Sequence, residues 1–364
     1  MERHAQRRDK LRSLMRSAQA DAMLVTNELN VTYLTGFTGD SSYLLLTRDR
    51  EIILSDARYE EDLRAECPDV TAEIRRPPTK MGEWVERVVS SVKPKALAIE
   101  ADSLTLTQFD QFATSLPNVN LVKTSGLVEQ LREIKDKDEI AETRHAVRLA
   151  ERAFAVIRAA MRPDQTEREI ARELEHQIRL LGGRGCAFPP IVAVGPQAAL
   201  PHARPGDRRI EESPFVLIDW GAVSRLYRSD LTRVLATAKI SPKLETIYRV
   251  VLRAQQAAID TIRPGVALEA VDAAARKVIE AAGYGRQFSH GLGHGIGLQI
   301  HEAPRVGQNE KRLLKPGMIV TVEPGIYIPQ WGGVRIEDDV LVTRSGCEVL
   351  SSTPKELSQC VVEF

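Results

Sequence analysis

Several features that mark specialised classes of protein are scarce or absent in this sequence of 364 residues. It has only four cysteines, which are scattered and form no CxxC pair, so a disulfide scaffold is excluded and a reduced compartment is expected. No run approaches the roughly 18 apolar residues of a membrane-spanning helix. The charged N-terminus also lacks the apolar core of a secretory signal. We therefore expect a cytoplasmic protein with no membrane partner.

An excess of charge of either sign is also absent. Lysine plus arginine and aspartate plus glutamate each number 50, so the formal net charge is zero. Proteins that bind nucleic acid usually carry a strong basic excess. We therefore expect no nucleic-acid partner.

The length predicts two domains, at roughly 150 residues each. The first 130 residues alternate short apolar runs with helical patterns, which is typical of an α/β domain. We expect strands at 22–26, 43–47, 52–55 and 96–99, helices at 58–66 and 81–92, and a turn within 30–37. A charge cluster at 135–139 opens a long helical pattern that runs to Met161. We therefore place the boundary near residue 133, which gives domains of residues 1–132 and 133–364.

The second domain is predicted to be α+β. Thr166 and Glu169 have the spacing of a capping box, so a helix should begin there and stop at Gly182. Two further helices are expected at about 242–262 and 268–282, and strands at 215–219, 231–236, 318–323 and 334–343.

Four acids lie in or beside these apolar strands. Asp219 ends one strand, and Asp230 directly precedes the next. Glu323 and Glu337 occur on two later strands. A single buried acid is most often a salt-bridge partner, but four in such places would repel one another unless positive charge lay between them.

Histidines cluster in the segment SHGLGHGIGLQIH. It holds His290, His294 and His301, interleaved with four glycines, which allow the backbone to approach a ligand closely. Another histidine, His202, lies in a loop before the strand that ends at Asp219. Carboxylates and imidazole together predict a mixed oxygen and nitrogen site for two divalent ions, which could activate a water molecule. The helical HExxH zinc motif is absent, because Arg305 stands where its second histidine would be.

These residues resemble a known family, the pita-bread metallopeptidases, in the branch of aminopeptidase P and prolidase. The resemblance lies in the motifs IDWGAVSRLYRSDLTR, SHGLGHGIGLQIHE, VTVEPGIYI and GVRIEDDVLVT. The segments NVTYLTGF and LREIK are similar to the creatinase-type N-terminal domain and its junction. The resemblance implies an α/β N-terminal domain followed by an α+β pita-bread catalytic domain.

The resemblance also implies a role for each site residue. The metal ligands would be Asp219, Asp230, His294, Glu323 and Glu337. Glu323 would also handle the proton of the bridging water, while His202 and His301 would contact the substrate and its tetrahedral intermediate. His290, Arg335 and Tyr327 would line the proline-side pocket, and Arg335 could instead, or in addition, be a partner of Glu337.

The function this implies is that of an Xaa-Pro aminopeptidase, in which a metal-bridging hydroxide attacks the bond between an N-terminal residue and a following proline. The alternative is an Xaa-Pro dipeptidase (prolidase), which shares all these motifs, and we favour the aminopeptidase because of the chain length. A creatinase-like hydrolase that is not a peptidase, or a metal-free binding scaffold, would keep the fold but lose the ligand set. Manganese is the preferred metal, with cobalt or zinc as alternatives. The expected partners are proline-containing peptides and a second copy of the chain in a homodimer.

Overall fold

The computed structural model describes residues 2–364, and the chain folds as two compact units divided between Arg132 and Glu133. Among the described residues, no helix has both the length and the apolar character needed to cross a bilayer.

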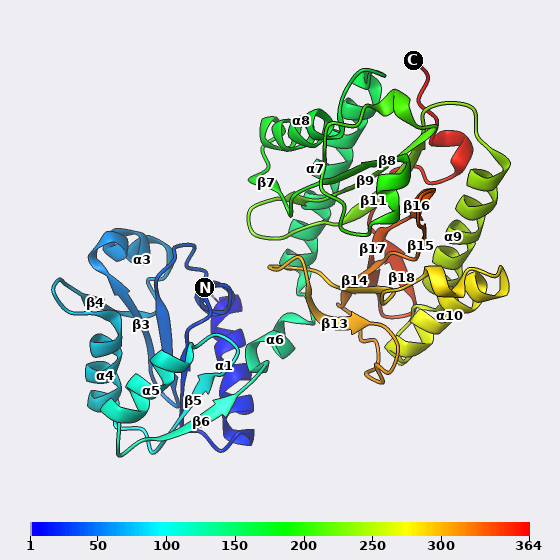
Figure 1. Cartoon of the computed structure of the whole chain (residues 1–364). Coiled ribbons are helices and arrows are strands. Elements are labelled where there is room, and N and C mark those ends of the chain that lie inside the picture. The colour runs from blue at the N-terminus through cyan, green and yellow to red at the C-terminus, as the bar shows by residue number, and fades with distance from the viewer. Residues whose placement is uncertain (1) are drawn as a thin grey trace. The chain divides into compact units, whose positions relative to one another are not determined.

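The N-terminal unit contains a mixed sheet. Its strands are β1 (Ala22–Val25), β2 (Tyr43–Thr47), β3 (Glu51–Asp56), β4 (Thr71–Arg75), β5 (Ala96–Glu100) and β6 (Asn120–Thr124). Its helices are α1 (Glu2–Ser17), α2 (Glu28–Thr35), α3 (Glu60–Glu66), α4 (Met81–Val92), α5 (Leu106–Ser115) and α6 (Leu127–Arg132). The strand order is β4-β3-β2-β1-β5-β6 (Figure 1). β1 pairs antiparallel with β2 and parallel with β5.

Both faces of this sheet are covered. Successive side chains of a strand point to opposite faces, and neighbouring residues of β1 are both buried. Leu24 and Leu45 pack in one core with Val85 of α4 and Phe112 of α5. Met23, one position away from Leu24, is also buried. The helix α1 lies on the side of the sheet away from α4 (Figure 1).

The turn expected within 30–37 is wrong, because most of this segment belongs to the helix α2. The side chain of Asn27 caps the start of α2 by accepting hydrogen bonds from two backbone amides. Gly36 ends the helix with a left-handed φ of 86°. Gly36 therefore marks the end of a helix, whereas Asn30, the other residue that suggested a turn, is buried inside it. The elements β4, α5 and β6 were also not predicted.

The second unit holds four long helices and several small sheets. The helices are α7 (Lys137–Ala160), α8 (Glu167–Leu180), α9 (Pro242–Thr261) and α10 (Leu268–Ala281). The strands are β7 (Gly185–Cys186), β8 (Ile191–Val194), β9 (Phe215–Trp220), β10 (Ala222–Val223), β11 (Leu231–Ala236), β12 (Gly293–Gly295), β13 (Glu302–Val306), β14 (Ile319–Val322), β15 (Gly325–Ile328), β16 (Gly332–Arg335), β17 (Asp338–Val342) and β18 (Cys347–Val349). They form sheets in the orders β11-β9-β8 and β13-β12-β14-β17-β18, and the pairs β15-β16 and β10-β7.

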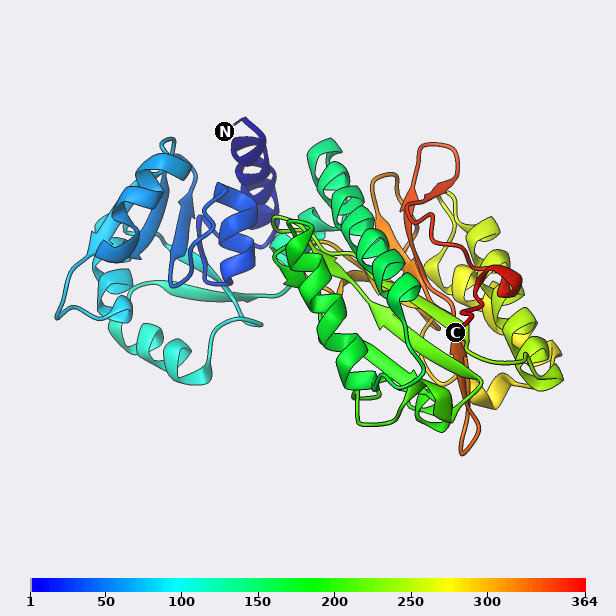
Figure 2. The same cartoon turned by 90° about the horizontal axis from the view of Figure 1, so that it is seen from above.

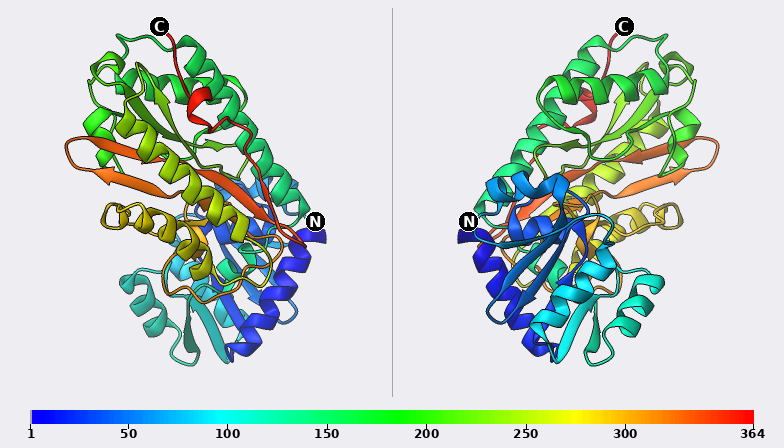
Figure 3. Two further views of the ribbon diagram at one scale, coloured as in Figure 1. Left: turned by 90° about the vertical axis from the view of Figure 1, so that its right-hand side faces the viewer. Right: turned by 90° about the vertical axis from the view of Figure 1, so that its left-hand side faces the viewer.

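The β11-β9-β8 sheet separates two hydrophobic cores. Ile218 and Trp220 face the core of α7 and α8, which lie side by side in Figure 2. Phe215 and Leu217 face the core of α9 and α10, the yellow-green and yellow helices of Figure 3. Asp219 follows the same alternation as Phe215 and Leu217, so its side chain enters the interior that holds β14 and β16.

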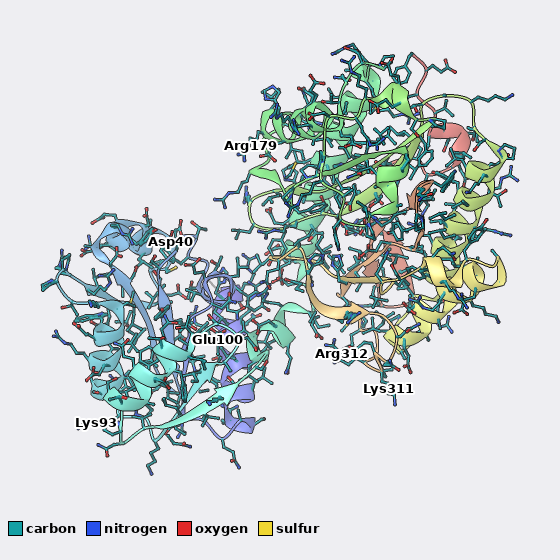
Figure 4. The ribbon with its side chains drawn as sticks, viewed as in Figure 1. Asp40, Lys93, Glu100, Arg179, Lys311 and Arg312 are labelled. Atoms are coloured by element: carbon teal, nitrogen blue, oxygen red, sulfur yellow. The ribbon has the colours of Figure 1, made fainter. Side chains whose placement is uncertain are left out.

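The single strand expected at 334–343 is interrupted. β16 ends at Arg335 and β17 begins at Asp338, so Glu337 lies between them. There the backbone of Glu337 bridges to Thr232 of β11. Lys93, Arg179 and Lys311, which are labelled in Figure 4, are exposed charged residues, whereas Glu100, labelled in the same view, is buried.

Candidate metal centre

The five predicted ligands are carried by strands that meet in the interior of the second unit. Asp219 lies in β9, and Asp230 directly precedes β11, the antiparallel neighbour of β9. His294 lies in β12, and Glu323 directly follows β14, which pairs with β12. Glu337 joins the two sheets through its bridge to Thr232.

Three of these residues form a tight group of potential ligand atoms. Each of Asp230, His294 and Glu337 offers one potential ligand atom, and these three atoms lie within 4.8 Å of one another. Nε2 of His294 lies 3.6 Å from Oδ2 of Asp230 and 3.5 Å from Oε1 of Glu323. Asp219 is outside this tight group and is bonded instead to Arg335.

The tautomer of His294 follows from its hydrogen bonding. Its Nδ1 lies 3.0 Å from the carbonyl oxygen of Gly295, which can only accept, so Nδ1 carries the proton. Burial lowers the pKa of His294 to about 4, so the ring is neutral near pH 7. Its Nε2 therefore presents a lone pair to the carboxylates of Asp230 and Glu323. When the carboxylates are ionised, this arrangement is repulsive unless a cation lies between these atoms.

The carboxylates also have oxygen atoms without partners. Oδ1 of Asp219, Oδ1 of Asp230 and Oε1 of Glu337 are buried and have no hydrogen-bond partner. A buried acceptor without a partner is costly, and several around one point are typical of cation ligands. The residues present therefore fit a site for divalent metal ions.

The pKa values of the acids reflect the same crowding. Burial, followed by repulsion from Glu337 and Asp219, raises the pKa of Asp230 well above its usual value. Burial and repulsion from Glu323 raise the pKa of Glu337 in the same way. Burial is also the main reason why the pKa of Glu323 rises to about 8. Without a cation, these carboxyl groups hold protons that a bound metal would displace.

Three residues that the sequence analysis missed orient the carboxylates and the histidine. The hydroxyl of Thr232 donates to Oε2 of Glu337 at 2.6 Å. Thr321 accepts the backbone N–H of His294. Asp339 accepts the backbone N–H of Asp230. Thr232 lies two residues after Asp230, and that spacing on a strand is the one sequence signal that could have identified it.

A chain of hydrogen bonds connects the predicted pocket residues with Asp219. Nη2 of Arg335 lies 2.6 Å from Oδ2 of Asp219, and Nη1 donates to the hydroxyl of Tyr327 at 2.8 Å. Nδ1 of His290 donates to the carbonyl of Gly291, so Nε2 of His290 accepts the Tyr327 proton at 2.9 Å. The carboxylate that Arg335 bonds directly is therefore Asp219, which the sequence analysis did not name as its partner.

His202 and His301 lie at the exposed side of this group. Both side chains are exposed, and the rings of His301 and His294 meet edge to face with centroids 4.3 Å apart. After burial, the nearby charge of His202 is the next cause that lowers the pKa of His301. Both imidazoles are thus close to the metal group and accessible to a ligand.

Comparisons with known proteins reveal similar chains over nearly the whole length of the sequence. Residues 141–344 match metallopeptidase family M24, and residues 7–134 match the creatinase/prolidase N-terminal domain. An Xaa-Pro dipeptidase from Bacillus anthracis is 38% identical, with a TM-score of 0.94 over 98% of this chain and 99% of that chain. A prolidase from Pyrococcus horikoshii is 33% identical, with a TM-score of 0.91 over 97% and 99%. An X-Pro aminopeptidase from Thermotoga maritima is also 33% identical, with a TM-score of 0.88 over 95% and 99%.

Proposed function

The chain belongs to metallopeptidase family M24, and on that premise we propose that it is an Xaa-Pro dipeptidase. Such an enzyme hydrolyses the peptide bond of a dipeptide whose second residue is proline. The sequence had favoured an aminopeptidase, with the dipeptidase as the alternative. The similarity to the dipeptidase from Bacillus anthracis and the prolidase from Pyrococcus horikoshii supports the alternative better.

We propose that five residues hold two divalent cations, with manganese preferred over cobalt or zinc for so carboxylate-rich a site. The observation that carries this proposal is the lone pair of His294 Nε2 facing Asp230 and Glu323 at 3.6 and 3.5 Å. When bound, the cations supply positive charge that lowers the pKa of a water molecule and polarises the scissile carbonyl group. The proposed ligands are Asp219, Asp230, His294, Glu323 and Glu337.

Other steps of the proposed reaction depend on side chains of the protein. The carboxylate of Glu323 accepts the proton of the attacking water and returns it to the leaving proline nitrogen. His301 and His202 donate hydrogen bonds to the carbonyl oxygen as it becomes negative. His290 and Tyr327 form a wall of the proline pocket, and the hydrogen bond between them holds the two rings together.

A dipeptidase also needs a cation that recognises the free carboxylate of proline. Arg335 is 3% exposed and committed to Asp219 and Tyr327, so it is poorly placed for this role. Arg305 of β13 is exposed and lies opposite His294 in the pairing with β12. Directly opposed residues of antiparallel strands project to the same side of the sheet. We therefore propose Arg305 as the receptor for the substrate carboxylate.

The experiment compares Ala-Pro, its C-terminal amide and Ala-Pro-Leu as substrates of the manganese-loaded protein. We expect cleavage of Ala-Pro with a lower KM than its amide, and little release of alanine from Ala-Pro-Leu. The substitution Arg305→Met should remove the preference for the free carboxylate. Lys311→Met, a change to another exposed cation of the same segment, should leave that preference intact.

The second candidate remains an Xaa-Pro aminopeptidase. The X-Pro aminopeptidase from Thermotoga maritima, which is as similar in sequence as the Pyrococcus prolidase, favours it. Efficient release of alanine from Ala-Pro-Leu, with no advantage for Ala-Pro, would establish this candidate and refute the dipeptidase.

We also propose that the protein acts in the cytoplasm as a homodimer on proline-containing peptides. All four cysteines are free thiols, which agrees with a reducing compartment.

A further inference from the structure

An ion pair on α10 holds the backbone of the segment that carries His290. Nε and Nη2 of Arg276 each lie 2.9 Å from an oxygen of Asp272, one helical turn earlier. The same guanidinium donates to the carbonyl oxygens of Phe288 at 3.1 Å and His290 at 2.9 Å. Asp272 accepts the backbone N–H of Leu292 at 3.1 Å. One ion pair therefore bonds three backbone groups within five residues.

Besides this ion pair, the segment is held by the packing of Phe288 and Leu292 in the core and by a hydrogen bond from the backbone N–H of Glu323 to the carbonyl of Leu292. Residues 288–292 belong to no helix or strand and join the short helix at 285–287 to β12. The Arg276 guanidinium also lies over the ring of Phe288, 4.2 Å from its centroid. Asp272 is 1% exposed, so the pair is desolvated and its bonds to the backbone are stronger than those of a surface pair.

The side chain of His290 transmits this backbone position toward the metal group. Its Nε2 accepts from Tyr327, whose hydroxyl accepts from Arg335, and Arg335 is bonded to Asp219. A shift of the His290 backbone would therefore break the bond to Tyr327 or displace its ring from the pocket.

We propose that Asp272 and Arg276 are positioning residues, which set the place of His290 and hence the shape of the proline pocket. The proposal rests on the proposed function, since it needs a proline residue bound beside His290. The pair touches neither substrate nor metal ligands and acts through the backbone of residues 288–292. Misplacement of a group that binds substrate should weaken binding more than it slows the chemical step.

The test compares Arg276→Met and Arg276→Lys with Arg249→Met in the manganese-loaded full chain. Arg249 pairs with Glu245 on α9 at the same four-residue spacing, but both side chains are exposed, so it is a matched control. Steady-state hydrolysis of Ala-Pro gives kcat and KM, and hydrogen–deuterium exchange reports on residues 288–292. Arg276→Lys keeps the positive charge but lacks the forked guanidinium. It provides the same comparison if the methionine variant does not fold.

We expect Arg276→Met to raise KM about tenfold or more with kcat changed less than about threefold. In Arg276→Met, hydrogen–deuterium exchange at residues 288–292 should also become faster. Arg276→Lys should have KM and exchange rates between those of Arg276→Met and the unsubstituted protein. Arg249→Met should match the unsubstituted protein in both measurements. An unchanged KM in both Arg276 variants, whether or not exchange is faster, would overturn the positioning role. Failure of the unsubstituted protein to cleave Ala-Pro would refute the proposed function instead, and the exchange result would still show whether the pair holds the segment.

Discussion

Nε2 of His294 lies 3.6 Å from Oδ2 of Asp230, which is too far for a hydrogen bond between the two atoms. The proton of the imidazole is on Nδ1, where Gly295 accepts it. The lone pair and the carboxylate oxygen therefore face each other in a buried site without a hydrogen bond. A divalent cation between them turns this repulsion into two coordination bonds. The opposed atoms of His294 and Asp230 therefore indicate a metal site at the group formed by Asp230, His294 and Glu337.

Metal removal should make the stability of the protein depend on pH. In the metal-free protein the pKa of Glu323 is raised from 4.5 to about 8, mainly by burial. The unfolded chain therefore binds fewer protons than the folded chain between these values, and the free energy of unfolding falls as pH rises through this range. Thermal unfolding after chelator treatment should show a lower Tm at pH 8 than at pH 5.5.

Manganese should abolish or reverse this trend, because bound cations keep the carboxylates ionised. An equal Tm of the chelator-treated protein at both pH values would show that burial and neighbouring charges do not raise the pKa of Glu323 as described.

The substitution Asp230→Asn should have opposite effects on the two forms of the protein. It removes one charge from a group of mutually repelling acids, so we expect the metal-free protein to gain about 1 kcal/mol in free energy of unfolding at pH 8. The same change removes a ligand, so manganese should no longer raise the Tm. Denaturant unfolding with and without metal measures both effects. Asp207→Asn, at an exposed position, should change neither. A loss of stability in both forms of Asp230→Asn would contradict the proposal.

The hydroxyl of Thr232 should control metal affinity without being a ligand. It donates to Glu337 and accepts from Nε of Arg335, so it fixes both side chains. Thr232→Val keeps the shape of the side chain and should weaken manganese binding by about 10- to 100-fold. Isothermal titration calorimetry measures the change. Thr237→Val, which removes another buried hydroxyl that bonds only a backbone carbonyl, is the matched control and should leave the affinity unchanged.

How far the site could be predicted from sequence depends on how local each signal is. The apolar runs of β9 and β11 predicted the strands, and an acid at the edge of each run is visible without a structure. The bond of Arg335 to Asp219 joins positions 116 residues apart and leaves no local pattern. Asn30 and Gly36 suggested a turn, because nothing in the local sequence shows that Asn30 is buried inside a helix that Asn27 caps.

The choice between dipeptidase and aminopeptidase was not predictable for a similar reason. It depends on what closes the pocket beyond proline, which is set by the packing of distant segments and not by chain length. Arg305 became a candidate only when the pairing of β12 with β13 placed it opposite His294.

A buried ion pair beside His301 should contribute strongly to stability. Nζ of Lys135 lies 2.9 Å from Oε1 of Glu302, and the two side chains are 0% and 3% exposed. Lys135→Met leaves the charge of Glu302 buried without this partner, which should cost about 3–5 kcal/mol in free energy of unfolding. Urea unfolding measures the loss. Arg168→Met removes the exposed partner of Asp207 and should cost less than about 1 kcal/mol. Similar losses in both variants would contradict this view of Lys135.

The most direct test of the account is the initial rate of Ala-Pro hydrolysis by chelator-stripped protein as manganese is added stepwise. We expect no hydrolysis without metal and a rate that reaches its plateau at about two manganese ions per chain. Hydrolysis that proceeds at full rate in the stripped protein, or no hydrolysis at any manganese concentration, would contradict it.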